Sequence, residues 1–420
     1  MAGMSTYVPD FSLQINETDL PAGLRSCLTS VRYEDGVASM LLAQDKEPSK
    51  AADRVEIEFA NPNLRWLQEH IRGLGFPAFP LAPTAVKVGA LRLPDGKAGN
   101  TFDLDNRLSL AVGYAPGARE HLFAGEVTGV QADFPATGVP TITLVAHDRI
   151  NRLAKGKIAR GFWILPDFLI AAIMSAENLL LPIIDPAVIA LSSATGILNA
   201  IFKHSGRKQR GQSDLELMKE IADAYDADFW VGDPPFEFEG LRGRTMYLSR
   251  IVFKEYEPRL TLTWGESLVS FTPRVSTVGQ IAGVAIRFTL PLIPISFVVV
   301  AAWDFDRECL SISTFPGAGA VQIGNLAGAV MTMIERTVKD PADIMTAALS
   351  ATRMLRSRIN NRLTASGTAI GDPRIRAGAV VQFDGIGPSF SGKYRIMAAS
   401  HTIDGQGYRT DFKARRELLP

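Results

Sequence analysis

Cysteine is scarce in this sequence, because Cys27 and Cys309 are the only two among 420 residues. Two thiols are too few for a disulfide framework or a thiolate metal site, so we expect the chain to fold in a reducing compartment. An excess of either charge is also lacking, since 44 Lys and Arg residues balance 44 Asp and Glu residues. The chain has no global field that would attract nucleic acid, and no nucleic-acid partner is expected.

Motifs for secretion and for catalysis are missing as well. Residues 1–10 lack a basic segment followed by an apolar core, so no signal peptide is expected. The five histidines are scattered, with none three or four residues from another, and no paired-histidine zinc motif is present. No Gly-x-Ser-x-Gly elbow occurs. We therefore predict no catalytic residues, no cofactor and no metal, and hence a protein that is not an enzyme.

Residues 387–394, with the sequence GPSFSGKY, come close to a phosphate-binding P-loop. The last position of that motif must carry a Ser or Thr hydroxyl for magnesium, and here it is Tyr394. A helix N-terminus must also follow, whereas Tyr394 begins an alternating strand. A β-turn is therefore the better prediction. His147 and His401 are interpreted as histidines that cap strand edges at matching places, not as ligands.

The chain does contain one pattern of alternating strands that occurs twice. In each copy an alternating strand leads to a Phe-x-Gly turn, a second strand, a glycine-containing turn and a third alternating strand. Period-2 alternation between Gly, Pro and Asp residues indicates antiparallel strands with one buried face. The first copy comprises residues 107–110, 123–127 and 141–145, and the second comprises residues 379–383, 390–394 and 408–412.

Three pairs of residues relate the two copies at a constant separation of 267 positions. Because the strand order agrees as well, we interpret the two copies as a duplication. Together with Tyr394, the paired residues are candidates for fold determinants first and for interface contacts second. The pairs are Phe123 with Phe390, Gly125 with Gly392, and Gly138 with Gly405.

The first domain is expected over residues 1–150. Short strands are predicted at 12–16, 28–33 and 53–59, where apolar and polar residues alternate. An insertion is predicted at 68–104, because Gly and Pro recur there and no period holds.

A second region, residues 151–212, contains the most apolar part of the chain at 161–202. Within it, residues 186–202 form an uncharged run of 17 residues, which is at the lower edge of what spans a bilayer. We interpret this region as a helical insertion that is buried or covers an interface. Membrane contact remains an open alternative.

Residues 213–267 are predicted to form a small α/β insert. Residues 213–216 (SDLE) form a capping box at the start of an amphipathic helix, since the Ser hydroxyl and the Glu carboxylate can each accept from the other's backbone amide. Strands are expected around 229–231, 246–248 and 260–264.

The second repeated domain is expected over residues 268–420. Residues 268–303 should form strands, because Pro291 and Pro294 argue against a helix there. A helix is predicted at 341–363, with a proline at its first position. Four arginines crowd its C-terminal half, which fits a solvated face and a partner-binding face equally well.

Eight short segments occur in an order that is similar to that of a known family. They are residues 7–11 (YVPDF), 55–62 (VEIEFANP), 125–130 (GEVTGV), 145–148 (VAHD), 215–218 (LELM), 221–222 (IA), 370–373 (IGDP) and 390–396 (FSGKYRI). Through these segments and their order, the chain resembles the late control D proteins of contractile phage tails and the hub portion of VgrG-type proteins in contractile injection systems.

The resemblance implies a mainly β fold with α/β inserts, in which two homologous tube-like β-barrel domains carry inserted smaller domains. It also implies a homotrimer, whose six barrels meet the hexameric ring of the inner tube protein while its threefold symmetry meets the spike. Other baseplate components are further expected partners. We expect assembly in the bacterial cytoplasm and then a place in the baseplate. Because the sequence ends at Pro420, soon after the second copy, the spike is expected to be a separate protein.

Two other functions are compatible with the sequence. One is a tail-associated cell-envelope hydrolase, with acid–base carboxylates among the inserts. The other is a membrane-anchored assembly factor that uses residues 161–202, a segment for which the resemblance gives no account.

Overall fold

The structure is a computed structural model. Most of the insertion expected at 68–104 and the start of the helix expected from residue 341 lie outside the residues that it describes. It describes residues 8–36, 52–61, 102–162, 165–202, 207–236, 238, 241–250, 256–276, 283–289, 296–304, 309–316, 333–337 and 344–417.

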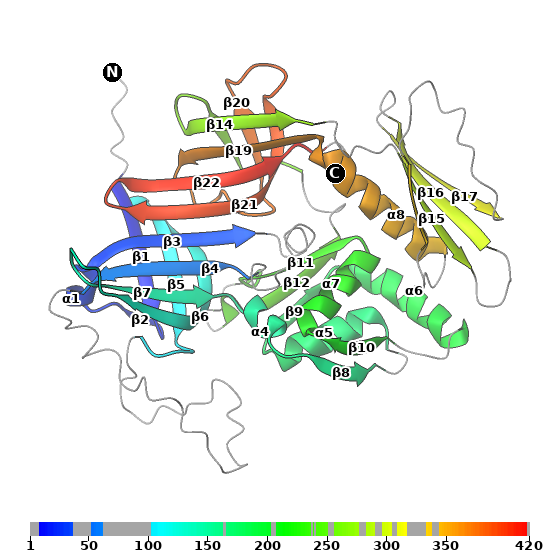
Figure 1. Cartoon of the computed structure of the whole chain (residues 1–420), viewed down its shortest axis with the longest axis horizontal. Coiled ribbons are helices and arrows are strands. Elements are labelled where there is room, and N and C mark those ends of the chain that lie inside the picture. Colours follow the sequence, from blue (N-terminus) through cyan, green and yellow to red (C-terminus); the bar gives the residue numbers. More distant parts are fainter. Residues whose placement is uncertain are drawn as a thin grey trace, which may run out of the picture.

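One large, mostly antiparallel sheet runs through the molecule (Figure 1), in the order β14-β19-β22-β21-β3-β4-β7-β6-β5-β1-β2, with β13 and β20 attached beside β21. We divide it into two β-units. The first β-unit comprises β1 (Val8–Ile15), β2 (Thr18–Asp19), β3 (Leu28–Gly36), β4 (Arg54–Ala60), β5 (Arg107–Ala115), β6 (Arg119–Asp133) and β7 (Thr141–His147), with the short helix α1 (Ala22–Arg25). The second β-unit comprises β13 (Leu260–Thr263), β14 (Leu268–Val275), β19 (Leu363–Ile370), β20 (Val380–Asp384), β21 (Gly392–Asp404) and β22 (Gly407–Arg415).

The strands form where the sequence alternates. In β4, Val55, Ile57 and Phe59 are fully buried, while the residues between them are half-buried. Alternate side chains of a strand point to opposite faces, so one face of β4 packs into the core of the first β-unit. The second β-unit has its own core of buried apolar residues, which includes Phe383, Tyr394 and Phe412. The predicted fold class, mainly β with α/β inserts, is confirmed.

The two β-units share their strand order. The path β3-β4-β7-β6-β5 in the first corresponds to β14-β19-β22-β21-β20 in the second, with antiparallel pairing throughout both paths. Two β-bulges also match. One lies after Val127 in β6 and after Ile396 in β21, and the other lies after Leu28 in β3 and after Leu268 in β14. Because a bulge is a local irregularity, two in matching places are a stronger sign of correspondence than strand order alone.

A buried ion pair occupies the same place in both β-units with its charges exchanged. In the first, Glu126 of β6 forms an ion pair with Arg149, which follows β7, at 3.0 Å. In the second, Arg395 of β21 donates to Glu417, which follows β22, at 2.7 Å. Glu126 and Arg395 occupy corresponding positions relative to the bulges, and each pair joins the second strand to the segment after the third. Both β-units therefore hold a pair of opposite charges at this place. The carboxylate is on the second strand in the first β-unit and after the third strand in the second β-unit.

We expect loss of the second ion pair to be costly, because Arg395 and Glu417 are both nearly inaccessible to water. Burial alone would raise the pKa of Glu417, but Arg395 and Arg415 outweigh it and hold the pKa below its ordinary value. Glu417→Gln leaves both guanidinium groups without a counter-charge, which should cost about 3–5 kcal/mol. The measurement is the urea midpoint of unfolding.

Glu257→Gln is the matched control, because Glu257 pairs with Lys393 in the same region but its side chain is 78% exposed. Exposed pairs contribute about 0.2–1 kcal/mol, so this variant should unfold close to the wild type. Equal effects of the two substitutions would contradict the assignment of Glu417 as a buried structural charge.

The structure corrects the residue-by-residue alignment of the two copies. Phe123-Ala124-Gly125 is not a turn, because it lies inside β6 opposite β5. Phe390 does precede β21, which starts at Gly392. The matched bulges are 269 positions apart, as Val127 and Ile396 are, so the separation of 267 misaligns the second strand by two residues. The shift is not visible in the sequence, because Phe123 with Phe390 and Gly125 with Gly392 are identical residues at the wrong separation.

The insert between the two β-units has a single core. The predicted boundary at residue 212 does not separate two bodies, because β9 pairs with β12 and the helices on both sides of residue 212 share one apolar cluster. The expected strand at 260–264 belongs to the second β-unit instead, since β13 pairs with β20. The insert comprises α4 (Ile150–Ala154), β8 (Ile158–Gly161), α5 (Asp167–Glu177), β9 (Leu181–Ile184), α6 (Pro186–Phe202), β10 (Lys208–Gln212), α7 (Asp214–Ala224), β11 (Ala227–Gly232) and β12 (Thr245–Arg250).

The helix α6 coincides with the uncharged run at 186–202, and Val188 on it is fully buried in the insert core. Helical structure in this apolar region is therefore confirmed. In the described part of the chain, no helix has the length and apolarity that crossing a bilayer requires. The capping box is confirmed too, because the Ser213 hydroxyl accepts from the Glu216 amide while the Glu216 carboxylate accepts from the Ser213 amide.

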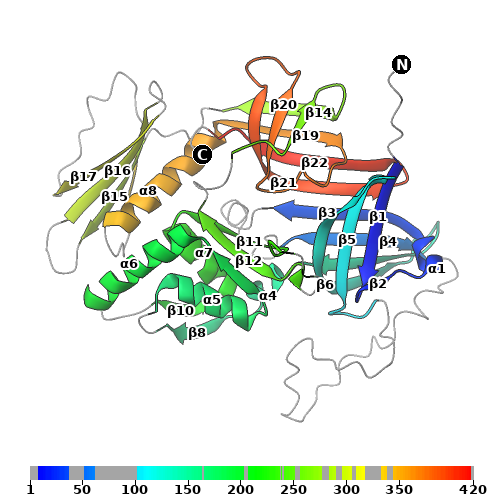
Figure 2. The same ribbon diagram turned by 180° about the vertical axis from the view of Figure 1, so that it is seen from behind.

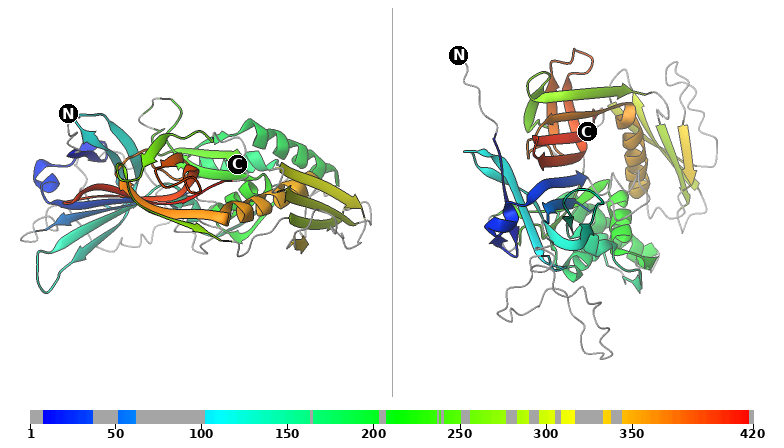
Figure 3. Two further views of the ribbon diagram at one scale, coloured as in Figure 1. Left: turned by 90° about the horizontal axis from the view of Figure 1, so that it is seen from above. Right: turned by 60° about the vertical axis from the view of Figure 1, so that its left-hand side comes forward.

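A separate sheet, which we call the outer sheet, interrupts the second β-unit between β14 and β19. Its order is β17-β16-β15-β18, and the helix α8 packs on it through a core of its own. Figures 2 and 3 show the insert and the outer sheet gathered at one end of the molecule and the β-units at the other. The elements are β15 (Gly283–Thr289), β16 (Ser296–Asp304), β17 (Cys309–Pro316), β18 (Met333–Thr337) and α8 (Ile344–Ile359), followed by one 3-10 turn, Asn360–Arg362.

Candidate functional site

The two β-units meet at a seam between β21 and β3, which we call the inner seam (Figure 1). The first half of β21 pairs with β20, and its second half, from Ala398 to Ile403, pairs antiparallel with β3. His401 lies opposite Tyr33 near the middle of the seam, and both are nearly inaccessible to water. The two rings are 5.7 Å apart between centroids. The inner seam thus continues both the backbone ladder and the buried core from one β-unit into the other.

His401 is held as a neutral side chain at this seam. Its Nδ1 lies 2.8 Å from the Tyr408 hydroxyl, and its Nε2 lies 2.9 Å from the carbonyl oxygen of Ile375. A carbonyl can only accept, so the proton is assigned to Nε2 and the Tyr408 hydroxyl donates to Nδ1. Burial, with a contribution from Arg376, lowers the pKa of His401 to about 3. His401 is therefore a structural residue in the interior of β21, and the prediction that it caps a strand edge is wrong.

Three carboxyl groups gather at one end of the inner seam. The Tyr33 hydroxyl donates to Asp53 at 2.8 Å and lies 3.2 Å from Asp35. The amide of Ala377, in the second β-unit, donates to Asp35 at 2.9 Å. Asp148 adjoins this pair, since its amide donates to the Asp53 carbonyl. The cluster therefore links the ends of β3, β4 and β7 to the segment before β20.

Burial determines the ionisation of these carboxyl groups. It raises the pKa of Asp53 to about 8, with a further contribution from the charge of Asp35, and it raises the pKa of Asp35 to about 6. Burial and the nearby Asp53 also raise the pKa of Asp148. At neutral pH the cluster therefore holds protons that free carboxyl groups would have lost, which reduces repulsion across the seam.

The raised pKa values predict that the folded protein loses stability as the pH rises. A carboxyl group with a raised folded pKa contributes stability that is fully present below its ordinary pKa near 4 and is lost as the pH rises through the folded value. For Asp53 that loss is complete above about 8. Asp53→Asn, whose amide can still accept from Tyr33, should flatten the decline between pH 5 and 8 by up to about 1.4 kcal/mol per pH unit. Urea midpoints across this range measure it.

The control is Glu34→Gln, because Glu34 lies on β3 between Tyr33 and Asp35 but forms a solvent-exposed pair with Arg32. This variant should keep the pH dependence of the wild type. If Asp53→Asn retains the full decline, the proton on the carboxyl cluster is not what makes the seam pH-dependent.

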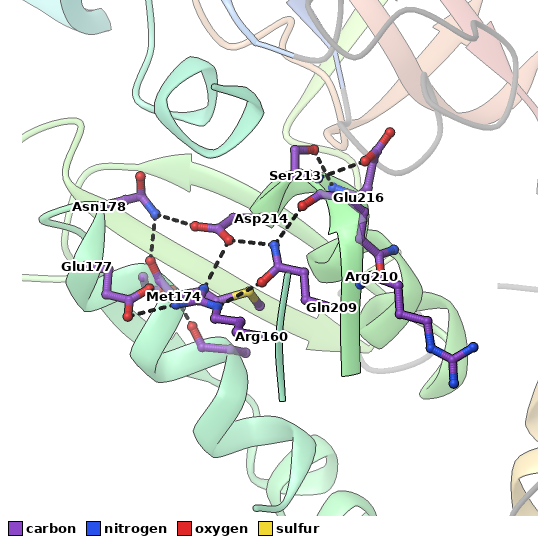
Figure 4. Close-up of polar contacts among 12 residues, drawn as sticks. Arg160, Met174, Glu177, Asn178, Gln209, Arg210, Ser213, Asp214 and Glu216 are labelled. Carbon is purple, nitrogen blue, oxygen red and sulfur yellow. Dashed lines mark hydrogen bonds and ion pairs between the residues drawn. The ribbon is translucent and has the colours of Figure 1, made fainter. Parts of the chain in front are cut away.

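In the insert, a polar network links the two-stranded sheet of β8 and β10 to the helices α5 and α7 (Figure 4). Arg160 of β8 donates to Gln209 of β10 at 2.8 Å, to Asp214 of α7 at 3.0 Å and to Glu177 of α5 at 2.6 Å. Asn178 donates to the other oxygen of Asp214 at 3.1 Å. Each carboxylate has donors from at least one neighbouring element, so the network is a brace between elements. In the part of the chain that the structure describes, no three His, Cys, Asp or Glu side chains are placed to hold a metal ion.

The residues singled out from the sequence do not form one cluster. Phe123 and Tyr394 are buried in the cores of different β-units. Gly125 is required by close packing, since a Cβ there would lie 2.3 Å from the carbonyl oxygen of His147. Gly392 instead has a left-handed φ of +143° at the start of β21. The remaining ones lie in connections: Gly138 between β6 and β7, Phe390 before β21, and Gly405 in the turn between β21 and β22.

The P-loop-like segment is confirmed as a turn that leads into a strand. β21 begins at Gly392 directly after it, so no helix N-terminus faces a phosphate. The Tyr394 hydroxyl donates to the carbonyl oxygen of Phe390 at 2.7 Å, which closes the turn.

Sequence reasoning gave His401 the wrong role and missed the other residues of the inner seam. Tyr33 shares the inward phase of Val31 along β3, which could have placed it in the core. Asp35 continues the same phase, and a carboxyl group on the buried face of a strand is a signal for a buried polar contact. That the contact joins the two β-units depends on the β21–β3 pairing, which residues more than 360 positions apart make.

Comparison with solved structures identifies this architecture. The 43 kDa tail protein of prophage MuSo2 from Shewanella oneidensis aligns with a TM-score of 0.58 at 10% identity, covering 98% of both chains. The chain has the fold of a prophage tail protein. A tail protein from Neisseria meningitidis MC58 aligns equally well, with a TM-score of 0.58 at 9% identity over 98% of this chain and 97% of that one. No protein-family model and no curated protein sequence matches the chain.

The tail-protein fold agrees with what the resemblance to late control D proteins implies. At these identities the similarity concerns the fold, and it extends over the insert and the outer sheet because nearly the whole of each chain is covered.

Proposed function

We propose that this chain is the baseplate hub of a contractile phage tail-like particle, where it adapts the hexameric inner tube to the trimeric spike. The observation that carries this proposal is the pair of β-units with the same strand order and the same bulges, joined edge to edge through the inner seam. Two equivalent units in one chain let three chains present six equivalent units.

The symmetry argument follows from how rings of protein subunits meet. A hexameric tube ring offers six identical surfaces, and a trimeric spike offers three. A trimer of a chain with two matching units satisfies both, because its β-units follow the sixfold pattern while its inserts and outer sheets follow the threefold one. The inner tube ring, a separate spike protein and other baseplate components are the partners of this hub, which assembles in the bacterial cytoplasm.

The hub acts through shape and sheet-edge contact, and we propose that it is not an enzyme. A cell-envelope hydrolase of the glycosidase type needs two carboxyl groups on either side of a substrate bond. The carboxyl groups with the most raised pKa values, at Asp35, Asp53 and Asp148, are instead engaged with Tyr33 and with backbone amides at the inner seam. Their arrangement supports a structural role.

The proposal predicts a homotrimer in solution. Light scattering coupled to size-exclusion chromatography should give three times the 45.6 kDa mass of one chain at micromolar concentration. The same sample should release no soluble fragments from purified peptidoglycan. A mass of one chain at every concentration, or peptidoglycan cleavage that Asp53→Asn abolishes, would favour a different function.

A further inference from the structure

The two-stranded sheet of β8 and β10, which we call the ribbon, lies at the margin of the insert, as Figures 1 and 2 show. Arg160 of β8 and Gln209 of β10 lie opposite each other, and both bond Asp214 of α7, so this face of the ribbon is turned toward the helices. Alternate residues of a strand point to opposite faces, and their neighbours therefore form a second face, which we call the outward face. The outward face comprises Ala159 and Gly161 of β8 with Lys208 and Arg210 of β10.

Four cationic side chains on and beside the outward face have no acidic partner. Lys208 and Arg210 lie on this face, and Lys155 and Lys157 closely precede β8. All four residues are exposed, and none forms an ion pair or a side-chain hydrogen bond with another described residue. Figure 4 shows the Arg210 side chain extending away from the network around Asp214. The ribbon therefore matches the charge on its inner face and leaves its other cations uncompensated.

The strand β8 also has an open edge. The Phe162 amide donates to the carbonyl oxygen of Arg207, which directly precedes β10. Because these directions alternate along an antiparallel pair, the N–H and C=O groups of Ala159 and Gly161 face away from β10. No described residue forms a backbone hydrogen bond with these groups. An edge of this kind can pair with a further strand.

The opposite edge of the ribbon, along β10, is interrupted. The register shifts between Arg210 and Gln212, where Gly211 has a left-handed φ of +68°. The Arg210 amide, which faces this edge, donates to the side chain of Gln212 at 3.4 Å. Bulges are one of the devices that keep sheet edges from pairing. A further strand is therefore expected to add at β8 and not at β10.

The outward face leaves room for another backbone. A Cβ atom placed on Gly156, Gly161 or Gly211 would have no described atom within 4 Å. The two outward residues of β8 are Ala159 and Gly161, so no large side chain of this strand covers the face. A glycine within a strand often marks the place where another backbone approaches closely.

We infer that β8 receives an extended acidic segment of a partner protein as a third strand of the ribbon. The open edge supplies hydrogen bonds to the main chain of that segment, and the uncompensated cations select acidic side chains. The same cations disfavour an uncharged or basic strand, because pairing would bring them against apolar or like-charged groups. The surface belongs to the insert, so the inference goes beyond the proposed hub and does not depend on its trimer.

The test measures the affinity of the full-length chain for a fluorescein-labelled octapeptide in which glutamate and valine alternate, by fluorescence anisotropy. Alternation places all of the glutamates on one face of the extended peptide, where they can meet the cations. The peptide should bind, and binding should weaken as the salt concentration rises, because the charges are exposed. The same peptide with lysine in place of glutamate should not bind. Failure of the acidic peptide to bind at low salt would overturn the inference.

Ala159→Pro tests the open edge, because it removes an N–H that faces away from β10 and leaves the hydrogen bonds between β8 and β10 in place. This variant should bind the acidic peptide about tenfold more weakly or less, because a main-chain donor is lost. Ala159→Thr is the matched control, since it keeps the N–H and should bind as the wild type does. Thermal unfolding of both variants checks that the insert stays folded. Equal binding by Ala159→Pro and the wild type would overturn strand addition.

A charge reversal, Lys157→Glu with Lys208→Glu, tests the cations and changes only exposed side chains, so it remains decisive should Ala159→Pro unfold. Repulsion replaces attraction in this variant, which should weaken binding of the acidic peptide by about tenfold or more. Its matched control is Lys413→Glu, because Lys413 is exposed on β22, away from the ribbon. The control should bind as the wild type does. Unchanged affinity in the charge-reversed variant would contradict the role of the cations.

Anionic vesicles separate an acidic strand from a lipid surface. Vesicles of phosphatidylglycerol and phosphatidylcholine offer negative charge without a backbone that could pair with β8. Binding of the acidic peptide without capture by the vesicles supports the added strand. Capture of the wild type and of Ala159→Pro alike, with no binding of the peptide, would assign the cations to lipid and overturn the inference.

Discussion

The pairing of β21 with β3 is the constraint on which the rest of the structure depends. It joins two β-units that an insert separates along the chain, and it does so through both a backbone ladder and a buried core. Tyr33 and His401 fill the middle of the seam, and a partly protonated carboxyl cluster closes one end. Without this seam the chain would hold two separate sheets, linked by side-chain contacts such as that of the Tyr114 hydroxyl with the Gly371 carbonyl.

Much of the fold could be predicted from the sequence, because local patterns specify it. Alternation at Val55, Ile57 and Phe59 indicated β4, the SDLE capping box indicated α7, and the uncharged run at 186–202 indicated α6. Duplication was predicted as well, although from residues that turned out not to correspond. Gly125 is fixed by packing against β7 and Gly392 by backbone conformation, so their identity was a poor guide to the alignment.

What could not be predicted depends on contacts between distant segments. The insert has one core because β9 pairs with β12 across the whole of α6 and α7, and β13 pairs with β20 across more than a hundred residues. The exchanged ion pairs, Glu126 with Arg149 and Arg395 with Glu417, share no sequence identity at all. Only the geometry of the strands and bulges reveals that they occupy the same place.

The most direct measurement of the central claim is a three-dimensional reconstruction of the purified oligomer by electron cryo-microscopy. The account predicts a ring in which six β-units lie at equal radius and follow sixfold order, with three inserts and three outer sheets placed around them. An oligomer in which the two β-units of each chain lie at different radii, or a closed dimer, would contradict it.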